Sequence, residues 1–317
     1  MYLFDLSPAH APLLLQAMRA VAKADGDESA QERALLDVVR ETLGLAEDAA
    51  ALPPFDLEDP ALDALDDAER ERLVQSMLLM AIMDGKGSRE EADLIERAAH
   101  RLGVTEPRVA NLRQLAEGRL GFMRLDLTRK GYARDELVRT AREEGVRGLY
   151  TTFAPLVGLA HDADVARRYI ALGELPKGTV GRAYFDLLQS NDLSFPGEGP
   201  IGERGVWHDM IHVVGGYPVD PKGEAEVVAF MAGFRREDPF FWVFTSVLQF
   251  QVGLRISPFA PGVPDQIDPR QTLHHARGAK VTCDLSRDWD FRADFSDDLE
   301  AVRKRFNVLP VTQAPGR

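Results

Sequence analysis

Four residues near position 210 have the types and the spacing of a metal-binding site. His208 and His212 are four residues apart, so on a helix their side chains lie one turn apart on the same face. Asp209 adjoins the first histidine, and Glu224 falls in the first turn of a second helical pattern that opens at Gly223. Imidazole nitrogens and carboxylate oxygens are ligands of zinc and similar divalent ions. The spacing therefore predicts a metal site built from two helices.

The same residues are also compatible with a hydrogen-bonded cluster that holds no metal, and the residues alone leave both interpretations open. The pattern differs from the metalloprotease His-Glu-x-x-His because Asp209 stands where that motif has Glu. The aspartate side chain is one methylene shorter, so it is better placed as a ligand than as a base acting on metal-bound water. We therefore do not predict a zinc protease.

Three blocks in the second half of the chain resemble the coenzyme Q biosynthesis family known as "Coq four". The first is His-Asp-x-x-His followed, after eleven residues, by Glu. The second is the Leu-Pro-Lys-Gly-Thr-Val-Gly run at 175–181, with Tyr184 close behind it, and the third is the Asp-Trp-Asp run at 288–290 before a helical pattern. The resemblance covers roughly residues 150–310, and it implies a helical protein of ubiquinone synthesis.

The resemblance also implies a ligand set and a chemistry. Its metal, most often zinc, is bound by four residues, which here are His208, Asp209, His212 and Glu224. The substrate implied is a polyprenylated quinone precursor, and the step is oxidative decarboxylation at ring carbon one, with the metal acting as a Lewis acid. No separate general base stands out in the sequence.

An aromatic-rich stretch follows the predicted metal site. Some of these rings are expected either to line an apolar tunnel for an isoprenoid tail, as the resemblance implies, or to pack in the core. The residues that we assign to lipid binding on the first interpretation are Phe230, Phe234, Phe241 and Phe244.

The first hundred residues contain an internal duplication. Helical patterns over 12–44 and 72–103 are each interrupted by an Asp-Gly loop, and the two copies align without a gap. In each copy a serine is followed three residues later by glutamate, which predicts a capping box at the start of the second helix. The arrangement resembles the TerB-like fold, an all-helical domain first named from tellurite-resistance proteins.

The first Asp-Gly loop is a weaker candidate for a second metal site. Carboxylates in and after this loop could supply oxygen ligands to a hard cation such as calcium, and TerB-like domains have been linked to metal binding near such loops. The favoured alternative is that these side chains cap helices and interact with the helix dipole. The candidate residues are Asp25, Asp27, Glu28 and Glu32.

Helical periodicity dominates the chain, so we predict an all-α fold with two helical domains. Residues 1–120 form an acidic TerB-like domain, 121–150 a connecting helix, and 151–317 the metal-site domain. Most of the excess of acidic residues lies in the first of these segments, so composition also divides the chain in two.

Composition limits the partners and the location. The net charge of −13 disfavours binding to nucleic acid. A single cysteine, Cys283, cannot form an intrachain disulfide or a cysteine-based metal cluster, which fits a reducing compartment. No apolar run is long enough to span a membrane, and the N-terminus lacks the pattern of a signal peptide. We expect a cytoplasmic protein with at most peripheral membrane contact.

Three functional hypotheses remain. The first is a metal-dependent enzyme of quinone synthesis, whose partners are a polyprenylated lipid or quinone precursor and other proteins of that pathway. The second is a non-catalytic lipid-binding or scaffolding protein with a structural metal, which a closed set of four ligands would favour. The third is a metal-responsive stress protein that acts through the TerB-like domain. Assembly as a homodimer is compatible with each of them.

Overall fold

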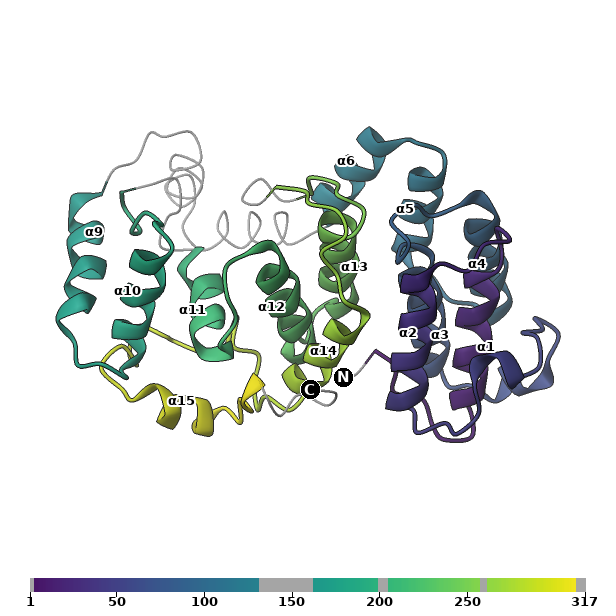
Figure 1. Cartoon of the computed structure of the whole chain (residues 1–317), viewed down its shortest axis with the longest axis horizontal. Helices are drawn as coiled ribbons and strands as arrows, with labels where there is room; N and C mark the ends of the chain where they lie inside the picture. The colour runs from purple at the N-terminus through teal and green to yellow at the C-terminus, as the bar shows by residue number, and fades with distance from the viewer. Residues whose placement is uncertain (1–2, 131–161, 199–204, 257–260, 312–317) are drawn as a thin grey trace. The chain divides into compact units, whose positions relative to one another are not determined.

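The computed structural model describes residues 3–130, 162–198, 205–256 and 261–311 of the chain (Figure 1). Within these ranges the regular secondary structure is helical, with one isolated bridge between Thr179 and Asp298 and no strand. The all-α prediction is thus confirmed. Most of the predicted connecting helix, from residue 131 onward, lies outside the described residues.

The chain divides into two compact units. Unit 1 consists of Met1–Leu127 and Asp238–His275, and unit 2 consists of Thr128–Glu237 and Ala276–Arg317. Each unit therefore contains residues from both halves of the chain. The domain limits 1–120 and 151–317 remain a prediction about sequence domains, but the packing adds 238–275 to the acidic N-terminal part.

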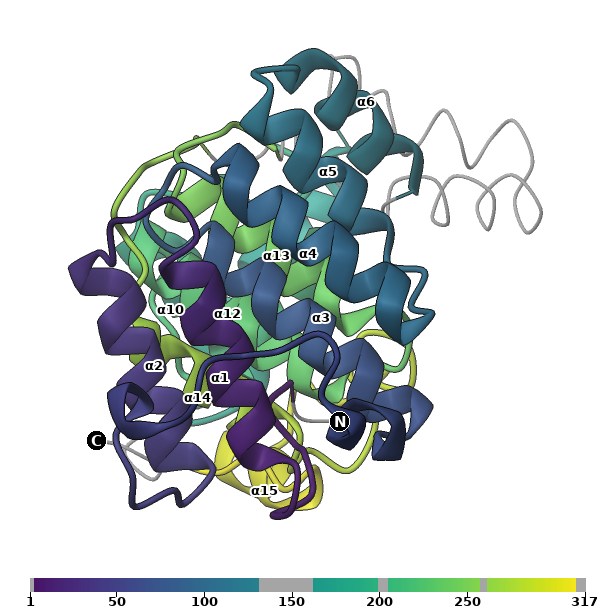
Figure 2. The same cartoon turned by 90° about the vertical axis from the view of Figure 1, so that its right-hand side faces the viewer.

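Unit 1 is built on the two repeats, whose helices face the viewer in Figure 2. Helices α1 and α2 form the first repeat, α3 and α4 the second, and the chain then continues through α5 and α6. Their bounds are α1 Ala11–Ala22, α2 Ala30–Thr42, α3 Asp67–Ala81, α4 Arg89–Leu102, α5 Pro107–Ala116 and α6 Leu120–Lys130. Short 3-10 helices, η1 Ala49–Ala51 and η2 Pro60–Ala64, lie in the linker between the repeats.

Local signals set the starts of the second helix in each repeat. The Ser29 hydroxyl accepts from the backbone N–H of Glu32, whose carboxylate accepts in return from the Ser29 N–H. Ser88 and Glu91 form the same reciprocal pair at the start of α4. Both predicted capping boxes are therefore confirmed, and each stabilises its helix by about 1 kcal/mol.

The core of unit 1 centres on α3. Residues 73–81 of α3 and the two residues that follow it are all buried, which is expected of a helix that is covered on every side. One of the helices that contact it is α13, Pro239–Phe250, from the second half of the chain. At the far end of α13, the Gln251 amide donates to the Met83 carbonyl oxygen over 3.0 Å.

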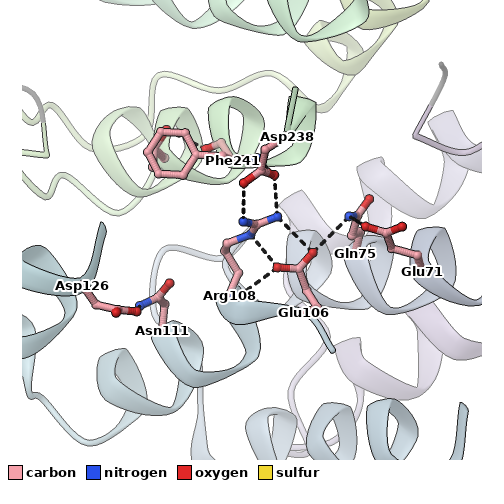
Figure 3. A network of polar contacts seen from close by, with 9 residues as sticks. Glu71, Gln75, Glu106, Arg108, Asn111, Asp126, Asp238 and Phe241 are labelled. Carbon is pink, nitrogen blue, oxygen red and sulfur yellow. Dashed lines mark hydrogen bonds and ion pairs between the residues drawn. The ribbon is translucent and has the colours of Figure 1, made fainter. Parts of the chain in front are cut away.

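A buried polar cluster also joins the start of α13 to the repeats (Figure 3). We call it the Arg108 cluster, and its members are Gln75, Glu106, Arg108 and Asp238. The Arg108 guanidinium donates to both Asp238 oxygens over 2.7 Å and contacts Glu106 at 2.6 Å. Gln75 donates to the other Glu106 oxygen over 3.0 Å. Three segments far apart in the sequence are thereby held together within unit 1.

Unit 2 carries the remaining helices. In chain order α9, α10, α11 and α12 stand side by side, and α15 crosses the ends of α10 and α11 (Figure 1). Their bounds are α9 Ala163–Ile170, α10 Val180–Ser190, α11 Val206–Gly215, α12 Pro221–Phe234 and α15 Leu299–Arg305, with the 3-10 helix η4 at Ala171–Glu174. The short elements η6, Pro269–Gln271, and α14, Thr272–Gly278, lie where the chain passes from unit 1 to unit 2.

The Leu-Pro-Lys-Gly-Thr-Val-Gly run has a structural task in unit 2. Thr179 caps α10 by accepting from the Arg182 N–H. The backbone N–H groups of Val180 and Gly181 donate to the carbonyls of Asp297 and Phe295. The run is thus a turn that holds the C-terminal segment against the start of α10.

No helix among the described residues combines the length and the apolar character needed to cross a bilayer.

Candidate metal centre

A tight turn between α11 and α12 brings the predicted ligands together. Helix α11 ends at Gly215, and Gly216 follows it with φ of 74°, a left-handed conformation that favours glycine. Asp220 then caps α12 by accepting from the Gly223 N–H over 2.7 Å. The helix starts at Pro221, two residues before the predicted Gly223, and Glu224 lies in its first turn as expected.

Three of the four predicted ligands converge. The Nε2 atom of His208 lies 3.2 Å from Glu224 Oε2, and His212 Nε2 lies 3.2 Å from Glu224 Oε1. The two Nε2 atoms are themselves 3.2 Å apart. Among the described residues, this trio is the one group of at least three histidine, cysteine or acidic side chains whose ligand atoms gather, all within 4.8 Å.

The hydrogen bonding of His212 leaves a lone pair facing this cluster. Its Nδ1 lies 3.3 Å from the Tyr217 carbonyl oxygen, which can only accept, so Nδ1 carries the proton. In the neutral ring Nε2 is then an acceptor, and it faces a carboxylate that also accepts. A cation between these groups, either a second proton on an imidazole or a metal ion, would relieve the repulsion between the two acceptors. The donor set therefore fits a divalent ion such as zinc.

The electrostatics supply an ionised carboxylate. Burial alone would favour the neutral acid, but the interactions of the carboxylate with the His208 and His212 imidazoles outweigh it and lower the pKa of Glu224 to about 2. Burial also opposes the charged form of His208, whereas its hydrogen bond to Glu224 raises the pKa of that imidazole. At neutral pH the Glu224 carboxylate is therefore charged.

Solvent reaches one side of the trio. The His212 side chain is 1% exposed, whereas those of His208 and Glu224 are 30% and 22% exposed. The Trp207 ring lies edge-on to the His208 ring at 6.0 Å between centroids. The exposed side of the trio is therefore formed by His208 and Glu224, and the Trp207 ring lies beside His208.

Asp209 lies next to the trio and has a different partner. Its Oδ2 accepts from the Tyr184 hydroxyl over 3.2 Å, and the fully buried Tyr184 stands on α10. Burial raises the pKa of Asp209, although the charges of His208 and His212 oppose the rise. The role of Asp209 as a fourth ligand stays a prediction. Its bond to Tyr184 joins two of the sequence blocks that resemble the quinone family.

Sequence reasoning missed the residues that contact the trio and its helix from elsewhere in the chain. Tyr217 acts through its backbone carbonyl, which no side-chain pattern reveals. Tyr184, the partner of Asp209, enters the sequence analysis only as part of a family-like run. A tyrosine in the helical segment before the predicted ligands could have indicated a hydrogen-bond donor to one of them. Arg277 and Arg303 approach α11 from more than 60 residues away, beyond the reach of local patterns.

The predicted residues of the first Asp-Gly loop have local partners. The Asp25 carboxylate accepts from the Asp27 N–H, and Glu28 pairs with Arg33 at 2.9 Å. Glu32 serves in its capping box. The second metal site at these four residues stays a prediction. The contacts of Glu32 are those of the alternative, in which these side chains cap helices.

The four phenylalanines assigned to lipid binding divide between the units. Phe230 and Phe234 belong to α12 in unit 2 and contact each other edge-on at 5.4 Å. Phe241 and Phe244 belong to α13 in unit 1. Phe230, Phe234 and Phe244 are buried, as core residues would be. Their role in lipid binding remains a prediction.

The fold and the trio together define an all-helical protein with a candidate divalent-metal centre in unit 2. The family model described as "Tellurite resistance protein TerB" matches residues 60–114, which run from η2 into α5. The second repeat of unit 1 is therefore similar to TerB, whereas the first repeat lies outside the match. No curated protein matches the chain. The resemblance of the C-terminal half to the quinone family stays a prediction.

Proposed function

We propose that unit 2 binds one divalent metal ion through His208, His212 and Glu224, and that zinc is the preferred ion. The observation that carries the proposal is the approach of three ligand atoms to within 4.8 Å, with His212 Nε2 turned toward Glu224 by the bond at Nδ1. Two imidazoles and one carboxylate form a set that catalytic zinc sites use, and it leaves one tetrahedral position for water or substrate.

We propose further that this centre acts on a polyprenylated quinone precursor. The support is the family-like sequence around the trio, together with the exposure of His208 and Glu224 on one side. A bound zinc ion would supply Lewis-acid stabilisation to a ring carboxylate or its neighbouring phenolic oxygen. Glu224 would hold the ion as a charged ligand, and the Tyr217 carbonyl would orient His212. Asp209 would keep the hydrogen bond that it accepts from the Tyr184 hydroxyl.

The proposed reaction is oxidative decarboxylation at ring carbon one. The ring carboxylate leaves as carbon dioxide, and a hydroxyl takes its place on the ring. This change removes two electrons from the substrate. With water as the source of the new oxygen atom, dioxygen accepts the two electrons and two protons and leaves as hydrogen peroxide. Zinc has no redox chemistry, so its part is limited to binding and charge stabilisation.

The first experiment is metal analysis of the purified full-length protein. We expect about one zinc or similar ion per chain, lost in His212→Ala and kept in His100→Ala, which removes an exposed histidine of unit 1. Wild-type protein without metal, even after zinc is added and excess removed, would refute the proposed centre. Full metal occupancy in His212→Ala would refute the ligand assignment.

Asp209→Asn then separates an open centre from a closed one. With three ligands, the variant should keep stoichiometric metal, and the wild type should convert a polyprenylated benzoate in the presence of dioxygen. Loss of the metal from Asp209→Asn, together with no conversion by the wild type, would favour the scaffolding alternative, in which four ligands hold a structural ion.

A second candidate function rests on the family match to unit 1. Similarity to a tellurite-resistance protein over 60–114 favours a role for this unit in a metal-related stress response. In that case metal added to the His212→Ala protein should still shift the unfolding temperature, through sites in unit 1. An unchanged unfolding temperature over millimolar zinc and calcium would remove this candidate.

A further inference from the structure

The C-terminal end of α11 has every one of its last four carbonyl groups satisfied. A helix end leaves these groups without partners inside the helix. The His212 carbonyl accepts from the N–H groups of Gly216 and Tyr217, at 2.8 and 3.1 Å. The other three carbonyls accept from two arginines of the C-terminal segment, so the helix that carries both histidines is capped by residues far away in the sequence.

The two arginines have different contacts. Arg303, on α15, donates to the carbonyls of Val213 and Val214 over 2.8 and 2.9 Å. Arg277, on α14, donates from Nη2 to the Gly215 carbonyl over 2.9 Å. Cations are favourable at the C-terminal end of a helix because they interact with its dipole. Both arginines therefore stabilise α11, but only Arg277 also donates a hydrogen bond to a side chain of the turn that follows, that of Tyr217.

Arg277 holds that turn from two sides. Besides the Gly215 carbonyl, it donates from Nη1 to the Tyr217 hydroxyl over 2.7 Å and from Nε to the Leu309 carbonyl over 2.6 Å. Its guanidinium lies over the Phe230 ring at 4.7 Å and over the Tyr217 ring at 5.1 Å. The residue is 2% exposed, so these contacts are protected from competing water.

The turn orients His212 through the backbone carbonyl of Tyr217. The Tyr217 carbonyl accepts the Nδ1 proton of His212 over 3.3 Å, and this bond directs the Nε2 lone pair toward Glu224. Arg277 bonds the last residue of α11 and the side chain of Tyr217, two residues further on. It thereby restrains the backbone that carries the Tyr217 carbonyl, without a hydrogen bond to the trio itself.

We propose that Arg277 is a positioning residue for the metal centre: by bracing Gly215 and Tyr217, it fixes the tautomer and the direction of His212. The inference rests on the proposed metal centre. Outer contacts that orient metal-bound histidines contribute about 10–100-fold to metal affinity. Arg303 provides a matched comparison, because it caps the same helix but makes no bond to the turn.

The test compares Arg277→Met with Arg303→Met in the full-length protein. Zinc affinity is measured by competition with a chromogenic chelator, the ligand field by the visible spectrum of cobalt-loaded protein, and folding by circular dichroism and thermal unfolding. Arg277→Met should bind zinc about 10–100-fold more weakly and change the cobalt spectrum. Arg303→Met should lower the unfolding temperature and leave zinc affinity and the cobalt spectrum unchanged.

Tyr217→Phe is the second variant, used also if Arg277→Met fails to fold. It keeps the backbone carbonyl but removes the phenol that Arg277 holds, so it should weaken zinc binding in the same direction and by a smaller factor. If Arg277→Met and Tyr217→Phe both bind zinc as the wild type does, the inference is wrong. Equal losses of affinity in Arg277→Met and Arg303→Met would also overturn it, because they would reflect helix stability alone.

A measurement on metal-free protein separates this inference from the proposed function. Nitrogen-15 NMR at one fixed pH reports which nitrogen of His212 carries the proton. Wild-type protein should have Nδ1 protonated, and Arg277→Met should have a mixture of the two tautomers. If the wild type binds no metal, but the protonated nitrogen of His212 still differs between the wild type and Arg277→Met, the proposed function is refuted and the positioning role is supported. An unchanged tautomer in Arg277→Met overturns the positioning role whether or not metal binds.

Discussion

The two ring nitrogens of His212 have separate tasks, and this separation explains why a histidine is needed at the position. Nδ1 donates to the Tyr217 carbonyl, and Nε2 faces Glu224 and His208. A glutamine or asparagine offers one donor and one acceptor on a flexible amide, but not in the rigid opposed geometry of an imidazole. The residue thus links the turn to the trio.

The titration of Glu224 and His208 determines where the metal-free site is most stable. The lowered pKa of Glu224 stabilises the fold above the ordinary value of 4.5, and this stabilisation is lost as the pH falls toward 2. The raised pKa of His208 stabilises the fold below 6.5, and this stabilisation is lost as the pH rises through the raised pKa. From these two groups, the metal-free site should be most stable between pH 4.5 and 6.5.

Added zinc should reverse this pH dependence. Metal binding requires neutral imidazoles, so protons compete with zinc at His208 as the pH falls. The increase in unfolding temperature caused by zinc should be largest near pH 8 and should disappear near pH 5, measured by thermal scans with and without the ion. His212→Ala should have no increase at either pH. An increase of the same size at pH 5 in the wild type would contradict the imidazole ligands.

At the scale of elements, the turn between α11 and α12 is the feature that makes the trio. A Cβ atom added at Gly223 would lie 2.1 Å from the Pro218 carbonyl oxygen, a distance that only movement of the backbone could relieve. The Asp220 cap also depends on this residue, because the Asp220 carboxylate accepts from the Gly223 N–H. The distance between the histidines and Glu224 therefore depends on a residue without a side chain.

Gly223→Ala is expected to damage both folding and metal binding. The clash should cost more than about 2 kcal/mol of unfolding free energy, and displacement of α12 should reduce zinc affinity. Gly121→Ala is the matched control, because that helical glycine has no atom within 4 Å of an added Cβ and the change should be neutral or slightly stabilising. Urea unfolding and zinc titration of both variants provide the comparison. A neutral Gly223→Ala would mean that the turn adapts easily.

The repeated loops of unit 1 offer a different element-scale test. Burial raises the pKa of Glu91 to about 7; the hydrogen bonds from Ser88 oppose the rise, and the charges of Asp84 and Glu32 add to it. Burial likewise raises the pKa of Glu32, its counterpart in the first repeat. A raised carboxyl pKa stabilises the fold below the ordinary value of 4.5, and the stabilisation is lost as the pH rises through about 7.

Glu91→Gln should therefore become relatively more stable than the wild type as the pH rises. Glutamine can still complete the capping box, and it avoids burying a charge, so the difference at pH 8 should be about 1–3 kcal/mol in favour of the variant. Denaturant unfolding at pH 5 and pH 8 measures it. Glu90→Gln, at the exposed neighbouring position, should leave the pH dependence as in the wild type. Parallel pH profiles for Glu91→Gln and wild type would contradict the assignment.

The sequence was informative where structure depends on neighbours along the chain. Two histidines at helical spacing and a glutamate in the first turn of a second helical pattern predicted that these three side chains meet, and Ser-x-x-Glu patterns predicted both capping boxes. These features depend on residues within one turn or one loop. The contact of Tyr184 with Asp209 and those of the two arginines with α11 join residues 25–90 positions apart, and no local pattern encodes such pairs.

At the scale of the whole molecule, the packing of residues 238–275 is information that the sequence does not contain. The aromatic-rich stretch lies in the predicted second domain, 151–317, as a segment of sequence, and its helix α13 packs in unit 1 against α3. A predominantly apolar helix gives no sign of which core it enters, because most of its faces can be buried. The partner of Asp238, Arg108, is 130 residues away.

The Arg108 cluster should therefore contribute strongly to the stability of unit 1 (Figure 3). Arg108→Ala leaves the buried Glu106 carboxylate without its cation and should cost about 3–5 kcal/mol, because removing one partner of a buried ion pair exposes the full desolvation penalty. Asp238→Asn keeps an oxygen for the cap of α13 and leaves Arg108 paired with Glu106, so about 1–3 kcal/mol is expected. Urea unfolding of the full-length protein measures both values.

Arg113→Ala is the control for this series, because it removes an arginine from the same helix, α5. Arg113 pairs with Asp93 and Glu96 near the surface, where ion pairs contribute about 0–1 kcal/mol. If 238–275 is an integral part of unit 1, the three variants should rank with Arg108→Ala the least stable and Arg113→Ala close to wild type, and the first should also make the chain sensitive to proteolysis between 238 and 275. Equal, small effects for all three would mean that α13 associates with the repeats without help from the cluster, through its apolar side chains alone.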